Sequence, residues 1–338
     1  MANIKDIAQY CGVAVSTVSR VLNEHPDVSP QTRQKIMAAV EQFQYIPNTS
    51  ARNLVKPNSD SLLVLMRGVS NPFFARLVRV IQQEVARRGL GLELQQIDTH
   101  EDELRAARML INERKPLGLL LLGGRFNYEP AEVALISTPF VMCTYTNTFG
   151  SLAPDSYSSV SIDDRAAARQ AVEVLISRGH RRIAILADSQ NDRSISELRL
   201  QGYGDALHQA GLSCDPALLA CTHSFSNLPS IYRAMSRLIE SGAEFTAVFA
   251  IADLMALAAI KALSDHGRRV PEDCSVIAID GLDLTAYTLP VLTTLVQPVE
   301  EMGRTCVEKL MERIQGRQEN GQLLIVPTLR EGGSVAPI

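Results

Sequence analysis

Residues 4–23 read IKDIAQYCGVAVSTVSRVLN, and this stretch predicts two short helices joined by a tight turn. Its first half repeats apolar residues at the spacing of one helix face, and Gly12 then stops the helix. A second helix follows over residues 15–22 with an apolar face of its own. Two such helices have the pattern of a helix-turn-helix, whose second helix enters the major groove of DNA. A small helical bundle that only packs fits the same pattern, so the pattern alone leaves both interpretations open.

A third helix is expected to complete this N-terminal unit. Ser29 is placed to cap it, Pro30 to occupy its first position, and apolar residues recur on one face over 36–43. Residues 1–59 hold six basic and four acidic side chains, a net charge of +2, whereas the rest of the chain carries −6. This modest asymmetry weakly favours contact between the N-terminal unit and DNA.

The rest of the chain alternates short apolar runs with amphipathic helical segments. Seven runs have the character of buried strands: LLVLM (62–66), LELQQI (92–97), GLLLLG (118–123), FVMCTY (140–145), RIAILA (182–187), AVFAI (247–251) and SVIAID (275–280). Such alternation predicts parallel sheets with helices on both faces, and seven runs are too many for one small sheet. We therefore expect two α/β lobes with a ligand cleft between them. The chain is expected to cross between the lobes near 161–164, 290–292 and 316–322.

The composition is that of an ordinary globular protein, since 46% of the 338 residues are hydrophobic and 21% are charged. No run approaches the ~20 apolar residues of a membrane span, and the first ten residues lack the apolar segment of a signal peptide. We therefore expect a cytoplasmic protein that does not contact a membrane. The six cysteines are widely spaced, which favours reduced thiols over disulfides or metal ligands. Hydrolase, phosphate-loop and zinc-protease motifs are absent from the sequence, so no catalytic residue, metal site or cofactor is expected.

Several longer motifs follow one another along the chain in a recognisable order. They are IKDIAQYCGVAVSTVSRVLN (4–23), VSPQTRQKI (28–36), YIPNTSARNL (45–54), NPFF (71–74), GHRRIAIL (179–186), RLQGY (199–203), VPEDCSVIAIDGLD (270–283) and LPVLTTLVQP (289–298). With these motifs the chain resembles, essentially from end to end, the lactose/galactose repressor family of bacterial transcription regulators. The resemblance implies a multidomain protein with an all-α N-terminal helix-turn-helix domain and a two-lobed α/β core similar to type I periplasmic binding proteins.

The resemblance also implies where the domains begin and end. The helix-turn-helix domain is expected over 1–58, with a hinge helix at about 48–56 that pairs with its dimer mate in the minor groove, and the effector-binding and dimerisation core over 59–338. Lobe 1 of the core is expected over about 60–161 and 291–318. Lobe 2 is expected over about 162–290 and 319–338.

The helix over 15–22 is, by resemblance, the recognition helix. Arg20 can donate two hydrogen bonds to guanine O6 and N7, or instead contact a phosphate. Leu54 would be an apolar wedge between the central base pairs, or else a plain linker residue. Ala14 stands where the family usually has a capping Ser, which should cost ~1 kcal/mol of helix stability. Val15, Ser16 and Arg20 are expected at the base-reading positions, and the residues expected to contact phosphates are Thr17, Ser19, Asn23 and Thr32. In the hinge helix the expected DNA-binding residues are Asn48, Ala51 and Leu54.

An effector site between the lobes is also implied by the resemblance. Arg199 matches the family's ligand-clamping arginine, and Asp280, at the end of a strand, matches its acidic contact. Thr144 and Ala252 stand where sugar-binding members often have Asp and Asn, so a nucleoside, a modified sugar or a glycoside fits at least as well as a free hexose. The expected effector-binding residues are Phe73, Phe74, Thr144, Arg199, Phe225, Ala252 and Asp280. One of the two adjacent phenylalanines is expected to serve mainly core packing.

These observations predict a homodimeric repressor that binds a near-palindromic double-stranded DNA operator under the control of a small-molecule effector. A cytosolic small-molecule sensor or solute-binding module without specific DNA readout is the alternative. An enzyme is a third class, which the missing motifs disfavour. The sequence leaves open which effector binds, and whether the effector releases DNA or promotes binding.

Overall fold

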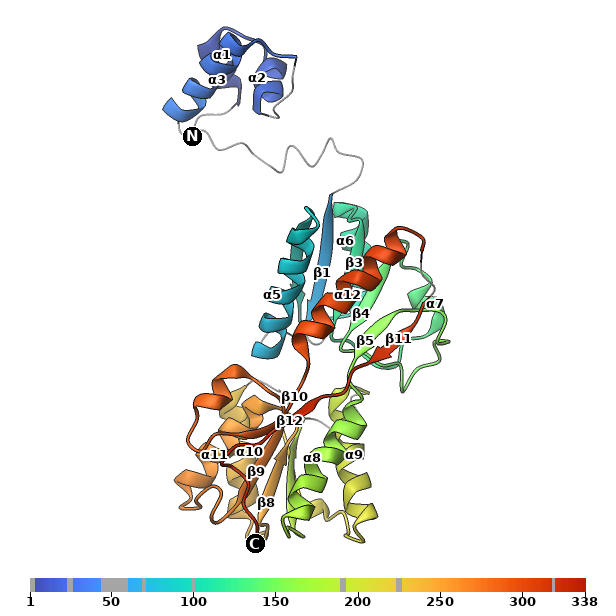
Figure 1. The fold of residues 1–338 in the computed structure, drawn as a ribbon, viewed down its shortest axis with the longest axis vertical. Coiled ribbons are helices and arrows are strands. Elements are labelled where there is room, and N and C mark those ends of the chain that lie inside the picture. The colour runs from blue at the N-terminus through green and yellow to red at the C-terminus, as the bar shows by residue number, and fades with distance from the viewer. Residues whose placement is uncertain are drawn as a thin grey trace. The chain divides into compact units, whose positions relative to one another are not determined.

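The computed structural model describes residues 4–22, 27–43, 60–68, 71–98, 101–188, 193–222, 227–317 and 320–338. They belong to two compact units, Met1–Ser59 and Asp60–Ile338 (Figure 1). Five residues with an expected role lie outside the described residues, as does the hinge helix expected at about 48–56: Asn23, Asn48, Ala51, Leu54 and Phe225. Within the described ranges, no helix is both long enough and apolar enough to span a bilayer.

The N-terminal unit contains the three helices that the sequence predicts, α1 (Ile4–Cys11), α2 (Val15–Leu22) and α3 (Pro30–Gln42). Gly12 turns the chain between α1 and α2 with a φ of +65°, a left-handed conformation that glycine adopts without strain. The Ser29 hydroxyl accepts a hydrogen bond from the backbone N–H of Thr32 at 3.3 Å, which confirms the expected cap of α3. The small core of this unit consists of Ile7, Ala8, Cys11, Val18, Val21, Ile36 and Ala39.

The first lobe of the core unit is built on a six-stranded parallel sheet in the order β11-β5-β4-β3-β1-β2. Leu62 and Val64 of β1 pack in the core shared with α5 and α12, whereas Leu63 and Leu65 pack with α6, because alternate residues of a strand point to opposite faces. Helices α5 and α12 lie side by side over one face (Figure 1). The elements are β1 (Ser61–Arg67), α5 (Pro72–Arg87), β2 (Gly91–Ile97), α6 (Glu103–Arg114), β3 (Gly118–Leu122), α7 (Pro130–Val133), β4 (Phe140–Cys143), β5 (Ser159–Ser161), α12 (Val299–Ile314) and β11 (Gln322–Leu324).

The second lobe has a six-stranded sheet in the order β12-β10-β9-β8-β6-β7, in which β12 is antiparallel to β10 and the other pairs are parallel. Helix α8 packs against α9 and α10 packs against α11, so that the two pairs cover the two faces of the sheet (Figure 1). The elements are α8 (Asp164–Ser177), β6 (Ile183–Ala187), α9 (Ile195–Gln209), the short 3-10 helix η1 (Pro216–Leu218), β7 (Leu219–Cys221), α10 (Leu228–Glu240), β8 (Ala247–Ala250), α11 (Asp253–Asp265), β9 (Ser275–Asp280), the 3-10 helix η2 (Asp283–Tyr287), β10 (Thr293–Val296) and β12 (Thr328–Arg330).

All seven predicted apolar runs form strands, and the first crossing near 161–164 lies between β5 and α8, as expected. The other two predicted crossings, and the lobe boundaries that follow from them, are wrong. β10 pairs with β9 in the second sheet, so residues 293–296 belong to lobe 2 and not to lobe 1. β11 pairs with β5 in the first sheet, so residues 322–324 belong to lobe 1 and not to lobe 2. Both strands are short and not strongly apolar, and backbone pairing with a neighbouring strand places them.

Candidate functional site

The exposed face of α2 carries three of the residues that the sequence assigns to DNA readout. Val15, Ser16 and Arg20 are exposed, whereas Val18 and Val21 are buried in the core of the N-terminal unit. A helix that packs through one face and presents apolar, hydroxyl and guanidinium groups on the other can contact base edges in a major groove. The geometry of α2 therefore suits the role of a recognition helix.

The residues assigned to phosphate contacts are more enclosed. Thr17 and Ser19 of α2 are half-buried. Thr32, in the first turn of α3, shares a hydrogen bond of 2.8 Å with the hydroxyl of Ser29. Small hydroxyl groups near helix ends can set the register of a protein on the DNA backbone, and these three phosphate assignments stay predictions.

In the core unit, a buried guanidinium gathers carboxylates at the junction of the two lobes. Arg199 of α9 is only 2% exposed, and its Nε donates to Oδ1 of Asp164 at 2.9 Å. Its Nη1 donates to the backbone carbonyl of Ile251 and lies 3.6 Å from Oδ1 of Asp280. The structure thus brings together Arg199 and Asp280, which the sequence singled out, and adds Asp164, which it did not.

Asp280 connects this cluster to the first lobe. It ends β9 with a φ of +138°, a backbone conformation that non-glycine residues rarely adopt and that is often retained at binding sites. Gln297 Nε2 donates to its Oδ1 at 2.9 Å, and Asn71 Nδ2 from the first lobe donates to its Oδ2 at 3.2 Å. The side chain of Asn71 also caps α5 by accepting from the N–H of Phe73 at 3.0 Å. One amide therefore fixes a helix of lobe 1 and a carboxylate of lobe 2 together.

Asp253, the first residue of α11, holds the loop that follows Asp280. Its fully buried carboxylate accepts from the N–H of Leu282 at 2.7 Å and from the hydroxyls of Thr285 at 3.2 Å and Thr294 at 2.5 Å. These three donors make Asp253 a structural residue, and the cap position of α11 itself is taken by Ala252.

Burial raises the pKa values of all three carboxyl groups. It raises the pKa of Asp164 from 3.8 to about 6, although the attraction of Arg199 opposes the rise. It likewise raises the pKa of Asp280 against the pull of Arg199. Burial and the neighbouring Asp280 carboxylate together raise the pKa of Asp253. The carboxyl groups of Asp164 and Asp280 thus both lie against the single Arg199 guanidinium, and this surplus of acidic groups disfavours any further negative charge.

The first lobe contains the expected site residues Phe74, in the first turn of α5, and Thr144, directly after β4. Thr144 follows β4 with a φ of +59°, and its hydroxyl oxygen accepts from the N–H of Gly123 at 3.2 Å. The ring of Phe74 borders the same glycine, since a Cβ atom built on Gly123 would lie 3.5 Å from its Cζ. Phe73 is 3% exposed and belongs to the hydrophobic core, which confirms that one of the two rings serves packing. Phe74 is therefore the better ligand candidate of the pair. Ala252 is buried beside Ile251.

Further contacts hold the two lobes against each other. Arg76 of α5 reaches across the junction, with its Nη1 3.3 Å from Oδ1 of Asp283. The N–H of Phe126 donates to the carbonyl of Arg193 at 2.9 Å, and Leu198 of α9 packs into an aromatic core of the first lobe. Arg199 follows Leu198 directly, so one turn of α9 carries both a contact between the lobes and the guanidinium of the buried cluster.

Sequence reasoning missed Asn71, Asp164 and Gln297. Two of them carry a signal that was visible: Asn71 precedes a proline at a helix start, and Asp164 directly follows the first crossing between the lobes. Gln297 follows β10, which was not recognised as a strand, so nothing marked it as the residue beyond a strand end.

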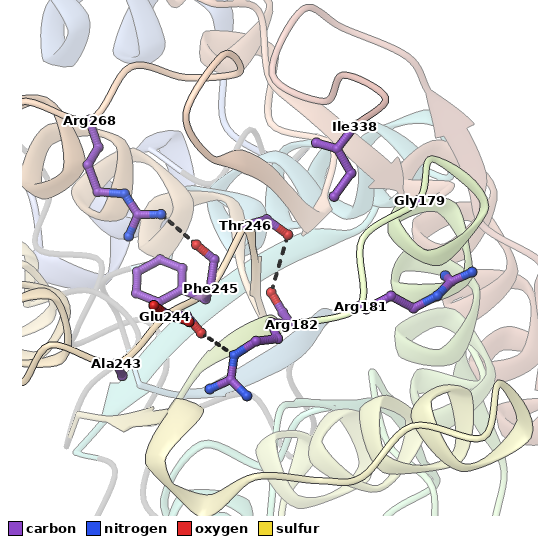
Figure 2. A pocket seen from close by; sticks show the side chains of 9 residues that line it. All are labelled: Gly179, Arg181, Arg182, Ala243, Glu244, Phe245, Thr246, Arg268 and Ile338. Carbon is purple, nitrogen blue, oxygen red and sulfur yellow. Dashed lines mark hydrogen bonds between the residues drawn. The ribbon is translucent and has the colours of Figure 1, made fainter.

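A cavity of about 500 Å³ lies away from this cluster, around the loops that precede β6 and β8 of the second lobe (Figure 2). Three arginines line it, and they are partnered by nearby carbonyls: Arg181 donates to Ile176 in the last turn of α8 at 3.1 Å, and Arg182 to Glu244 at 2.6 Å. The third, Arg268, stacks on a phenylalanine ring. Because the carboxyl ends of helices carry partial negative charge, these cations are explained as partners of helix ends and loop carbonyls. The cavity gives no reason to move the candidate site away from Arg199.

Two family models match the chain. Residues 3–48 match the model described as bacterial regulatory proteins, lacI family, and residues 172–335 match the periplasmic binding protein-like domain. The first match covers the helix-turn-helix unit. The second covers most of the second lobe, the lobe that holds Arg199 and Asp280.

Full-length similarity extends to regulators and to their solved structures. The HTH-type transcriptional regulator MalR of Clostridium butyricum is 37% identical over 334 residues, which are 98% of this chain and 98% of that protein. A solved complex of the transcriptional regulator CelR with cellobiose is 30% identical, with a TM-score of 0.73 over 99% of this chain and all of that one. The lac repressor dimer bound to operator and the anti-inducer ONPF is 25% identical, with a TM-score of 0.74 over 99% of both chains. On this evidence the chain belongs to the lacI family of bacterial transcription regulators.

Proposed function

We propose that the protein represses transcription as a homodimer bound to a near-palindromic operator, and that an uncharged, hydroxyl-bearing effector held at Arg199 and Asp280 sets its affinity for DNA. The effector is a sugar, a glycoside or a nucleoside, as the sequence suggests. The observation that carries the effector assignment is a pair of buried polar atoms in the cluster.

Nη2 of Arg199 and Oδ2 of Asp164 make no hydrogen bond to any of the described residues, although both side chains are at most 2% exposed. Nη2 lies 2.8 Å from the other carboxylate oxygen of Asp164, Oδ1, but at an angle unsuited to a hydrogen bond. Leaving a donor and an acceptor buried and unsatisfied costs about 1–3 kcal/mol each. A hydroxyl group can accept from Nη2 and donate to Oδ2 at the same time. The pair therefore favours a ligand with hydroxyl groups, and the surrounding carboxylates argue against an anion.

The complex of the relative CelR with cellobiose supports a sugar as the ligand. The flat face of Phe74 suits an apolar sugar face, a base or an aglycone, whereas Thr144 and Ala252 supply fewer polar groups than the family's usual Asp and Asn. This combination favours a disaccharide, glycoside or nucleoside over a free hexose.

Thermal unfolding with a panel of neutral sugars, glycosides, nucleosides and sugar phosphates tests the effector assignment. A ligand at 100 times its Kd adds about 2.7 kcal/mol of stability. We expect a neutral compound to stabilise the protein, and Arg199→Lys or Phe74→Ala to reduce that stabilisation. Arg181→Gln, in the separate arginine-lined cavity, is the matched control and should leave it unchanged. Stabilisation by sugar phosphates alone, or its loss in the control, would refute the assignment.

The exposed face of α2 supports sequence-specific DNA binding, and selection of random duplex DNA by the purified protein tests it. We expect enrichment of a near-palindromic site. Arg20→Ala should abolish the preference for guanine at one position in each half-site. Binding that is equally strong on all sequences and falls steeply with salt would favour the alternative, a small-molecule sensor without specific readout.

Exposed apolar residues support the homodimer. Tyr287, the last residue of η2, is 89% exposed, and Leu289 just after it is 94% exposed. Leu94 is 45% exposed on β2, at the edge of the first sheet. Clustered apolar side chains and an open sheet edge are both features that association covers. Light scattering should give the mass of a dimer for the full chain, and Leu289→Glu should shift it toward the monomer. A monomer at all concentrations would exclude the proposed assembly.

A further inference from the structure

Arg20, the arginine on the exposed face of α2, makes an ion pair that the sequence did not suggest. Its Nη1 lies 3.2 Å from Oδ2 of Asp27, which precedes α3, and both side chains are exposed, at 59% and 45%. The pair bridges the end of α2 and the segment that leads into α3. It places a carboxylate beside the group that is best suited to reading guanine.

A guanidinium has two edges with parallel N–H donors, and bidentate contact with guanine O6 and N7 uses one of them. When Nη1 is held by a carboxylate, the edge formed by Nε and Nη2 stays available. A flexible side chain fixed in this way loses less conformational freedom when it meets the base. We infer that Asp27 is a positioning residue that presents Arg20 for guanine readout. This inference rests on the proposed DNA binding through α2.

The charge of Asp27 has a second, opposite effect that makes the inference testable. A carboxylate on a DNA-facing surface repels phosphates, so its removal should strengthen binding to every sequence. If Asp27 positions Arg20, the same removal should weaken the preference for guanine. A residue that contributed only charge would change overall affinity and leave the preference untouched.

The experiment measures the affinity of the full-length chain for its selected operator and for the same operator with the guanine recognised by Arg20 replaced in both half-sites. The ratio of the two affinities is the discrimination. We expect Asp27→Asn to lower it about threefold, within the range of an exposed ion pair, and to raise the affinity for unrelated DNA. Asp27→Glu should retain most of the discrimination. Asp6→Asn, which removes another exposed carboxylate of the same unit, is the control and should leave discrimination unchanged.

A double-mutant cycle separates the possible outcomes. In the background of Arg20→Ala, Asp27→Asn should have no further effect on discrimination, because the residue acts through Arg20. Undiminished discrimination in Asp27→Asn, while Arg20→Ala abolishes it, would overturn the inference and leave the proposed function standing. An equal loss in Asp6→Asn would also overturn it. If Arg20→Ala itself keeps the preference for guanine, the readout assigned to α2 is wrong, and the inference falls with it.

Discussion

Gly202, in the motif RLQGY, allows the two helices that carry the buried cluster to approach closely. A Cβ atom built on Gly202 of α9 would lie only 2.1 Å from the backbone carbonyl oxygen of Arg165 in α8. An unstrained contact between carbon and oxygen needs roughly 3.3 Å or more, so Gly202→Ala must push the helices apart by about 1 Å. Arg165 follows Asp164 directly, and Gly202 lies one helical turn after Arg199. The same displacement therefore stretches the 2.9 Å hydrogen bond between Arg199 and Asp164.

The size of the effect follows from two opposing terms. Overpacking costs about 1–3 kcal/mol, and the upper part of this range applies because a backbone carbonyl cannot rotate away. Replacing a helical glycine by alanine returns about 1 kcal/mol. Gly202→Ala should therefore lose about 2 kcal/mol of stability. Gly204→Ala is the matched control, since a Cβ atom at that position would meet nothing within 4 Å, and it should gain about 1 kcal/mol through helix propensity alone.

Differential scanning calorimetry of the two variants measures the difference. About 3 kcal/mol separates them, which corresponds to roughly 6 °C in Tm at about 2 °C per kcal/mol for a unit of this size. Gly202→Ala should also bind the effector more weakly than Gly204→Ala does. If both variants unfold at the same temperature, close packing of α8 and α9 does not hold Arg199 against Asp164, and the reasoning fails.

Three further changes test the site and the helix-turn-helix unit. Asn71→Ala should cost about 1 kcal/mol of stability by removing the cap of α5, whereas Asn71→Ser should keep the cap but lose the hydrogen bond to Asp280. Weaker effector binding in both variants would support the role of that hydrogen bond, and weaker binding in Asn71→Ala alone would contradict it. Burial raises the pKa of Asp164 to about 6, above its value of 3.8 in the unfolded chain. This group therefore stabilises the fold most below about pH 4, and its contribution falls by on the order of 3 kcal/mol as the pH rises through 6. Asp164→Asn should flatten that part of the pH profile in urea unfolding, and an unchanged profile would contradict the assignment. Ala14→Ser should stabilise the N-terminal unit by about 0.5–1 kcal/mol through an N-cap bond to α2, detected as slower amide exchange in its first turn, and unchanged exchange would show that the position does not act as a cap.

The sequence predicted the elements whose identity depends on local pattern. Six of the seven predicted strands are almost wholly buried, so they appear in the sequence as apolar runs, and the three N-terminal helices repeat apolar residues on one face. Strands β5, β7, β11 and β12 have three residues each, which is too short for a pattern to stand out. These segments are strands because their backbones pair with an adjacent strand of the sheet. Since that strand lies far away in the sequence, the pairing leaves no local pattern from which it could be predicted.

The same distinction applies to the site. Arg199 and Asp280 lie in recognisable motifs, and each follows from local context. Their partners come from other parts of the chain: Asp164 lies 35 residues before Arg199, and Asn71 lies 209 residues before Asp280. Chemical type alone does not single out an aspartate or an asparagine among many. The sequence therefore identifies Arg199 and Asp280 as candidate site residues, and only the fold identifies the side chains that hydrogen-bond to them.

The contacts of Asp280 suggest how ligand and operator affinity are coupled. Asp280 belongs to the second lobe, which also holds Arg199, and its carboxylate accepts a hydrogen bond from Asn71 in the first lobe. Asn71 caps α5. The first strand of the same lobe, β1, begins at Ser61, close after the N-terminal unit ends. A ligand hydroxyl that competes for Asp280 weakens the hydrogen bond between Asn71 and Asp280. A ligand hydroxyl that instead bonds to Asp164 leaves that hydrogen bond intact and stabilises the arrangement in which the two lobes are joined by it. Under the proposed function, we expect the two cases to shift the balance between lobe arrangements in opposite directions, so that effector chemistry decides between release and retention of DNA. Whichever case holds, linkage requires the operator to change effector affinity by the same factor as the effector changes operator affinity.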